Sequence, residues 1–176
     1  MSRTADEQFD DERRGLALLE EASAAILAGV ERELAGWVER SVVHILDAWG
    51  RTTTDVREQA ERDARGAGDA ATERVVGELR ALFALDPEEQ RATPLEIVRG
   101  AYVEPTGVLA TVGIPPVERD EFAERAWPGD TYGLVVHGLG DLGDDDLAPL
   151  QMAWGLAKAK VLRARRTPRQ DGAPSA

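Results

Sequence analysis

Cysteine is absent from the 176-residue sequence, and its absence removes several kinds of chemistry at once. Without a thiol the chain can form no disulfide, no thiolate metal site and no cysteine nucleophile. Only two histidines occur, His44 and His137, and they lie far apart in the sequence. Because a zinc site draws most of its ligands from cysteine and histidine, we expect no zinc site.

Long hydrophobic runs are missing as well. A helix that crosses a bilayer needs about 18 or more consecutive residues that are almost all apolar, and no such run occurs, so no membrane span is expected. Residues 1–14 are rich in Asp and Glu, which is the opposite of a signal or transit peptide. Together with the absence of cysteine, these features predict a cytoplasmic protein.

The chain has 21 basic residues (Lys and Arg) and 33 acidic residues (Asp and Glu), so the net charge is −12. Since binding to phosphates needs Lys and Arg, we do not expect the body of the protein to bind nucleic acid. Near the C-terminus, however, six basic residues occur without an acid among them, namely Lys158, Lys160, Arg163, Arg165, Arg166 and Arg169. Without this stretch and Asp171 beyond it, 15 bases remain against 32 acids.

This basic stretch has two interpretations. It could contact nucleic acid, an anionic membrane or an acidic partner. Alternatively, basic residues near a helix C-terminus complement the helix dipole and lie against the acidic body. The structural interpretation is favoured, because no aromatic residue is interleaved among the basic positions.

Helical spacing of apolar residues dominates the first half of the chain. One face of a helix over 11–49 carries Leu16, Leu19, Ile26, Val30, Leu34, Trp37, Ile45 and Trp49. After a break at Gly50, a second helix to about residue 85 carries Val56, Ala60, Ala64, Ala67, Ala71, Val75, Leu79 and Leu82. The sequence therefore predicts a helical hairpin over 11–85, preceded by a disordered acidic segment over 1–10.

The length of this hairpin predicts self-association. A helix of about 35 residues is about 52 Å long, whereas a compact protein of this size is roughly 40 Å across. Either the helices kink at their glycines, or the hairpin projects and buries its surplus apolar face against a second copy; the second copy is the favoured interpretation. Ala22, Gly29 and Gly36 lie seven residues apart beside this face and are predicted to let another helix approach closely.

Prolines and helix-start signals characterise residues 86–166. Thr93-Pro94-Leu95-Glu96 combines a capping residue, a proline at the first helical position and a glutamate at the third. Asp144 to Asp146 are expected to cap a last helix, from Leu147 to Arg166. We predict an all-α fold in which the long hairpin packs on a compact bundle of shorter helices over 86–166, in the same domain, followed by a disordered tail over 167–176. The run over 132–136 could be extended, but it has no partner strand.

Residues 138–143 match the glycine pattern of dinucleotide-binding loops, GxGxxG. Three aspartates follow at 144–146, where they would repel a pyrophosphate, and no alternation of strands and helices surrounds the loop. The acidic residues at 141–146 also lack the spacing of an EF-hand. We therefore interpret the segment as a loop that ends in a helix cap, and we expect neither a cofactor nor a metal ion.

Two further groups are candidate contact residues. Glu33, Arg40 and His44 lie on one flank of the first helix and could form a polar pocket, or they could be ordinary surface and boundary residues. Trp127 and Tyr132 flank proline and glycine turns, where they could form a recognition surface or pack the loop onto the core. Serines inside the first helix lack the strained turn of a nucleophile, so no catalytic residue is predicted.

Three sequence runs carry a resemblance to a known group of proteins: TPLEIVR at 93–99, PPVERDEF at 115–122 and WGLAKA at 154–159. They are similar to runs in small uncharacterised helical proteins of high-GC actinobacterial type, and 19 Arg against two Lys fits that codon bias. The resemblance covers about residues 86–166. It implies no activity and no functional residue.

Three functions remain open at this point. The favoured one is a non-enzymatic helical interaction or adaptor protein that forms a homodimer through the hairpin. The alternative is a regulatory protein that contacts nucleic acid or another anionic partner through the basic stretch. The third is a small enzyme with an unrecognised pocket between the hairpin and the shorter helices.

Overall fold

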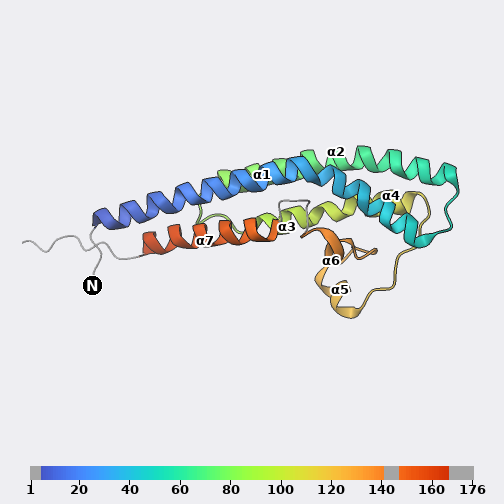
Figure 1. Ribbon diagram of the computed structural model, residues 1–176. Helices are drawn as coiled ribbons and strands as arrows, with labels where there is room; N and C mark the ends of the chain where they lie inside the picture. The colour runs from blue at the N-terminus through green and yellow to red at the C-terminus, as the bar shows by residue number, and fades with distance from the viewer. Residues whose placement is uncertain (1–4, 141–146, 167–176) are drawn as a thin grey trace, which may run out of the picture.

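The computed structural model describes residues 5–140 and 147–166, and within this part of the chain every regular element is helical (Figure 1). In chain order the elements are α1 (Ala5–Trp49), α2 (Thr54–Ala84), α3 (Pro94–Arg99), the 3-10 helix η1 (Gly100–Tyr102), α4 (Val103–Thr111), α5 (Glu121–Ala126), α6 (Leu134–Gly138) and α7 (Leu147–Arg166). The predicted all-α fold is confirmed. None of the described helices is long and apolar enough to cross a membrane.

Helices α1 and α2 form the predicted antiparallel hairpin. Gly50 adopts a left-handed backbone conformation with φ of 64° after the last residue of α1, and the side chain of Thr53 accepts a hydrogen bond from the backbone N–H of Val56 to cap α2. Arg57 pairs with Asp47 at 2.8 Å near the turn. Much farther along the hairpin, Arg80 pairs with Glu31 at 2.7 Å, which shows that the two helices stay side by side.

Helix α1 extends well beyond the end of α2, because it has 45 residues against 31. Figure 1 shows that α7 lies along this extension and runs antiparallel to α1. Consistent with that direction, Arg165 near the end of α7 pairs with Glu12 near the start of α1. Helices α3 and α4 continue the same layer along the other half of the hairpin (Figure 1). Helices α7, α3 and α4 therefore lie one after another along the hairpin, whereas α5 and α6 project from it, and the molecule is elongated (Figure 1).

Two local expectations differ from the structure. Helix α1 already begins at Ala5, so the predicted disorder of residues 1–10 is wrong for 5–10, where glutamate and aspartate in the first turn favour a helix start. Residues 132–136 are not extended, because α6 begins at Leu134 after Gly133 with φ of 69°. The predicted disordered tail at 167–176 lies outside the described residues.

Most of the predicted apolar positions of the hairpin lie in the core, but Leu16 and Trp49 are exposed. Ile26, Val30 and Leu34 of α1 and Ala60, Ala64 and Ala71 of α2 are completely buried. The predicted strip of small residues, in contrast, does not provide the closest helix contacts: a Cβ at Gly29 would have no neighbour within 4 Å. Those contacts lie at Gly68, where a Cβ would come within 2.8 Å of the Ala35 carbonyl oxygen, and at Gly15, where it would come within 2.9 Å of Val161.

Candidate functional site

The most distinctive surface feature is an apolar groove between α1 and α7. It encloses about 440 Å³. Its walls consist of Leu18, Glu21, Ala22 and Ala25 from α1 and Leu150, Ala153, Leu156, Ala157 and Lys160 from α7. Most of these side chains are apolar, and the charged ones are a single acid on α1 and a single base on α7.

Large apolar side chains are exposed along this groove. Leu18 is 44% exposed and Leu156 is 67% exposed. Met152 lies four residues before Leu156, hence on the same side of α7, and is also 67% exposed. Exposed alanines of the groove continue the surface on both helices, at Ala25 of α1 and at Ala153 of α7. We call this surface, made of these residues together with Glu21 and Lys160, the α1–α7 face.

The α1–α7 face owes its shape to the short side chains of alanine. Helices pack 8–10 Å apart depending on the side chains between them, and alanine allows the close end of that range. The face is therefore a shallow apolar surface with three larger side chains, Leu18, Met152 and Leu156, rising from it. Such an arrangement can accept another pair of helices but offers no acid–base pair or nucleophile for chemistry.

The two charges that line the groove have no partner within the described part of the chain. Neither the Glu21 carboxylate nor the Lys160 ammonium takes part in an ion pair or a side-chain hydrogen bond there. Their helices face each other across the groove, so the α1 wall carries negative charge and the α7 wall positive charge. Any partner that covers the α1–α7 face meets both signs of charge.

Two of the predicted basic contact residues, Lys158 and Arg165, make contacts within the chain. The ammonium of Lys158 donates to the backbone oxygen of Gln90 at 2.6 Å and lies 5.1 Å from the centre of the Trp154 ring. Removal from water lowers the pKa of Lys158, and nearby Arg91 lowers it further. Arg165 joins Glu12 of α1, at 2.8 Å, to Asp86 of the α2–α3 loop, at 2.7 Å.

The other predicted basic residues are more accessible. Arg163 and Arg166 are exposed and line a surface pocket of about 390 Å³ with Ala159 and Leu162. Lys160 is half-buried on the α1–α7 face. Arg169 lies outside the described residues. The basic stretch is thus divided between residues that hold α7 in place and residues that face solvent.

Of the two predicted aromatic contacts, Tyr132 is not at the surface. It is only 4% exposed, and its hydroxyl donates to the carbonyl oxygen of Ile114 at 2.5 Å. Burial raises the pKa of this hydroxyl. Of the two interpretations of Tyr132, packing of the loop onto the core agrees with this position, and a partner contact does not. Trp127 is half-buried, with the guanidinium of Arg99 4.2 Å from its ring centre.

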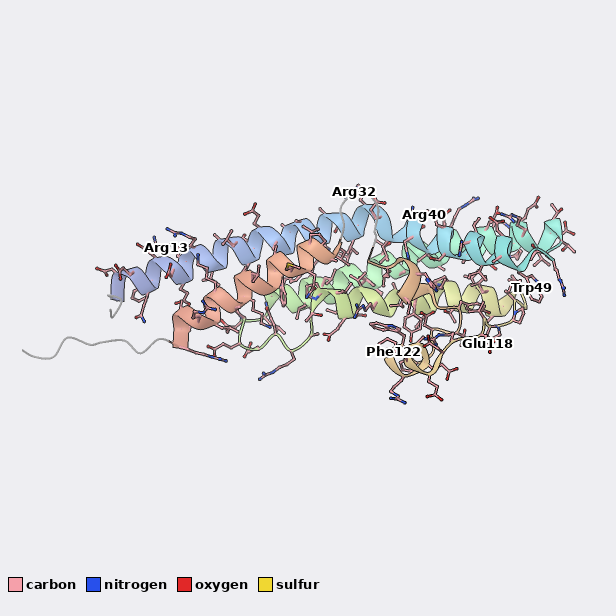
Figure 2. The ribbon with its side chains drawn as sticks, turned by 60° about the horizontal axis from the view of Figure 1, so that its bottom comes forward. Arg13, Arg32, Arg40, Trp49, Glu118 and Phe122 are labelled. Atoms are coloured by element: carbon pink, nitrogen blue, oxygen red, sulfur yellow. The ribbon has the colours of Figure 1, made fainter. Side chains whose placement is uncertain are left out.

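The exposed aromatic residue of this region is Phe122, which the sequence analysis did not single out. Phe122 is 77% exposed and lies in the part of the molecule that projects from the hairpin (Figure 2). A signal was available in the sequence: α5 is only six residues long and Phe122 is its one large apolar side chain. One such residue cannot form a buried stripe.

The predicted polar pocket of Glu33, Arg40 and His44 does not bring these side chains together. Arg40 and His44 are exposed, and Arg40 lies at the surface of α1 (Figure 2). The carboxylate of Glu33 pairs with neighbouring Arg32 at 3.2 Å. Within the described residues, no ion pair or hydrogen bond joins any two of the three. The surface interpretation of this group agrees with these positions.

A second pocket, of about 380 Å³, lies between α1 and the end of α2. It is lined by Leu16, Leu19, Glu20, Ser23, Phe83, Leu85, Pro87 and Gln90. The hydroxyl of Ser23 donates to the Leu19 carbonyl oxygen at 2.7 Å, so it is held by its own helix and has no base beside it. The side chains of this pocket form no nucleophile–base pair. The enzyme interpretation places its pocket between the hairpin and the shorter helices, which is the position of the mostly apolar α1–α7 groove.

No metal centre is apparent in the described part of the chain, where no three His, Asp or Glu side chains gather to hold an ion. Of the glycine pattern at 138–143, only Gly138 to Gly140 are described. The segment that precedes the pattern is helix α6, whereas a dinucleotide-binding loop follows a strand. The acidic residues at 141–146 lie outside the described residues.

Comparison with family models, with curated proteins and with solved structures finds no match in any of the three. The resemblance of residues 86–166 to small actinobacterial helical proteins stays a prediction. Function must therefore be inferred from the surfaces described above.

Proposed function

We propose that this protein is a non-enzymatic helical interaction protein that self-associates through the α1–α7 face. The observation that carries the proposal is the exposure of Leu18, Met152 and Leu156 beside an alanine-lined groove between two neighbouring helices. Exposed apolar surfaces of this kind are typical of protein–protein contacts. Fully burying one such side chain contributes about 1.5–3 kcal/mol, so covering all three favours association by several kcal/mol.

The expected contact surface shifts relative to the sequence prediction. The sequence predicted self-association through the hairpin, because its long helices have more apolar face than one small domain covers. In the structure α7 covers the part of α1 that extends beyond α2. The α1–α7 face therefore belongs partly to the hairpin, through α1, and partly to α7.

A charge placed in the α1–α7 face tests this proposal. Leu156→Glu puts a carboxylate at the most exposed apolar position of the groove, where a partner would have to bury it. We expect the wild-type chain to sediment as a dimer at micromolar concentration and the variant to sediment as a monomer. The measurement is sedimentation velocity over a dilution series.

A matched control separates the face from general surface effects. Phe122→Glu makes the same kind of change at a side chain that is even more exposed but belongs to α5. We expect this variant to remain a dimer. A monomeric wild-type protein at high micromolar concentration, or equal loss of association in both variants, would contradict the proposal.

Contact with nucleic acid or another anionic partner through the basic stretch has less support. Lys158 and Arg165 already have partners within the chain, which leaves fewer free charges for phosphates. Binding of this kind weakens steeply with salt. Its test is fluorescence anisotropy with duplex DNA and with RNA at low salt, comparing the wild-type chain with Arg163→Ala/Arg166→Ala.

A further inference from the structure

Glu21 and Lys160 indicate how two copies would meet. We infer that the α1–α7 faces of two copies pack against each other about a two-fold axis, so that Glu21 of each copy pairs with Lys160 of the other. This inference rests on the proposed self-association and specifies its partner and register. The product is a four-helix contact made of α1 and α7 from each copy.

The charges favour a second copy over other partners. Both groups line the same groove, and neither has a partner among the described residues of its own chain. An acidic helix laid on the groove would satisfy Lys160 but repel Glu21, and a basic helix would do the reverse. A second copy brings one acid and one base on the same surface, so it satisfies both.

Two-fold symmetry makes the pairing reciprocal. In such an interface, if residue i of one copy contacts residue j of the other, then j also contacts i. With the axis parallel to the helices, α1 of one copy lies over α7 of the other. Glu21 then faces the α7 wall that carries Lys160, and the same contact recurs on the other side of the axis.

The packing of the two faces is compatible with this arrangement. Helices α1 and α7 are antiparallel, so placing α1 of one copy over α7 of the other makes every neighbouring pair antiparallel. This is the arrangement of up-and-down four-helix bundles. Alanines at the contact let the helices approach, and Leu18 and Leu156 fill the space between them.

Charge reversal in separate chains tests the pairing directly. Glu21→Lys creates two contacts between like charges in its homodimer, and so does Lys160→Glu. We expect each variant alone to self-associate about tenfold or more weakly than the wild-type chain. When the two variants are mixed, every contact again joins opposite charges, so a heterodimer of near wild-type affinity is expected.

Native mass spectrometry of the mixture measures the heterodimer, and sedimentation velocity gives the affinities. Contacts within one chain cannot produce recovery on mixing, so such recovery requires pairing between chains. The double variant Glu21→Lys/Lys160→Glu is expected to form a homodimer of near wild-type affinity. Glu118→Lys and Arg125→Glu make the same changes of charge away from the α1–α7 face and are expected to leave association unchanged.

The possible failures are distinguishable. A wild-type chain that stays monomeric at high micromolar concentration overturns both the self-association and the pairing. The pairing is overturned if the wild-type chain dimerises but the single variants dimerise as tightly as it does. It is also overturned if mixing the two variants does not restore the dimer affinity. In both cases the chain would still self-associate, but through another register. Equal losses in the two control variants would also overturn the pairing, because they would assign the effect to net charge.

Discussion

Gly68 lies where α2 comes closest to α1. A Cβ built there would be 2.8 Å from the carbonyl oxygen of Ala35 and 3.0 Å from its Cα, and backbone atoms cannot move aside as a side chain can. Gly66, two residues earlier in the same helix, is exposed, and a Cβ there would meet nothing within 4 Å. A side chain is therefore excluded at Gly68 by the backbone of α1 and is not excluded at Gly66, although the two glycines look alike in the sequence.

We expect Gly68→Ala to destabilise the protein. Alanine favours a helix interior by about 1 kcal/mol relative to glycine, but forcing the two helices apart costs about 1–3 kcal/mol. Gly66→Ala is the control and should stabilise by up to about 1 kcal/mol. Urea denaturation of the three proteins measures both changes, and a Gly68→Ala variant as stable as Gly66→Ala would contradict the close contact.

Glycines also show where interpretation of single residues from the sequence fails. Gly29 and Gly36 were predicted to admit a neighbouring helix because they share a strip with Ala22. Periodicity places residues on a face, but it does not say which face another helix crosses. In the structure that crossing occurs at Ala35 and Gly68, which lie in different helices, so no pattern within one helix could reveal it.

At the scale of elements, Arg165 connects three of them. Its guanidinium joins α7 to Glu12 on α1 and to Asp86 in the α2–α3 loop. The hydrogen bond from Arg165 holds the pKa of the Asp86 carboxyl below its usual value, and a hydrogen bond from the backbone N–H of Glu88 acts in the same direction. The same two carboxylates raise the pKa of Arg165, which stays charged throughout.

This contact predicts an acid-dependent loss of stability. Because the pKa of Asp86 is lower in the folded than in the unfolded chain, its contribution is complete above the unfolded value of about 4 and is lost as the pH falls through the folded value. We expect Arg165→Met to be less stable than the wild-type chain at pH 7, with a difference that shrinks below about pH 4. Thermal unfolding monitored by circular dichroism at several pH values measures it.

A control variant makes this prediction specific. Arg166 is the exposed neighbour of Arg165, so Arg166→Met removes the same charge from the same turn. Its stability difference from the wild-type chain should be smaller and should not follow the titration of Asp86. A difference for Arg165→Met that stayed constant from pH 7 to pH 3 would contradict the assigned role of Asp86.

Most elements were predictable because their signals are local. The capping box at the start of α3 forms as the sequence indicated: the Thr93 side chain accepts from Glu96 N–H, and the Thr93 N–H donates to the Glu96 carboxylate at 2.7 Å. Helix α6 was missed because it has only five residues and its first N–H groups are capped from four residues before Leu134 and not by the residue next to the helix. The carboxylate of buried Asp130 accepts the N–H groups of Leu134 and Val135, both at 2.9 Å.

At the scale of the whole molecule, shape is the main finding. Helix α1 has 45 residues and is therefore about 67 Å long, far longer than the diameter of a compact protein of this size. Helices α2, α3, α4 and α7 extend along its length, and α5 and α6 project to one side (Figure 1). Part of the apolar face that was expected to need a second copy is thus covered by α7 of the same chain.

We expect small-angle X-ray scattering to show this elongation. A compact chain of 176 residues would have a radius of gyration of about 16 Å. A rod as long as α1 alone exceeds this value, so the monomer should give about 20 Å or more. The measurement needs extrapolation to low concentration, because association changes the result. A monomer value near 16 Å would contradict the extended arrangement.

Local signals in the sequence predicted the helical fold, the position of the hairpin turn and most of the hairpin core, because periodicity, glycine breaks and caps act over a few residues. Contacts between distant residues set which helix covers which part of α1. They buried Tyr132, engaged Lys158 and Arg165 within the fold, and left Leu18 and Leu156 exposed across one groove. These outcomes depend on contacts between residues far apart in the chain, so no local pattern encodes them.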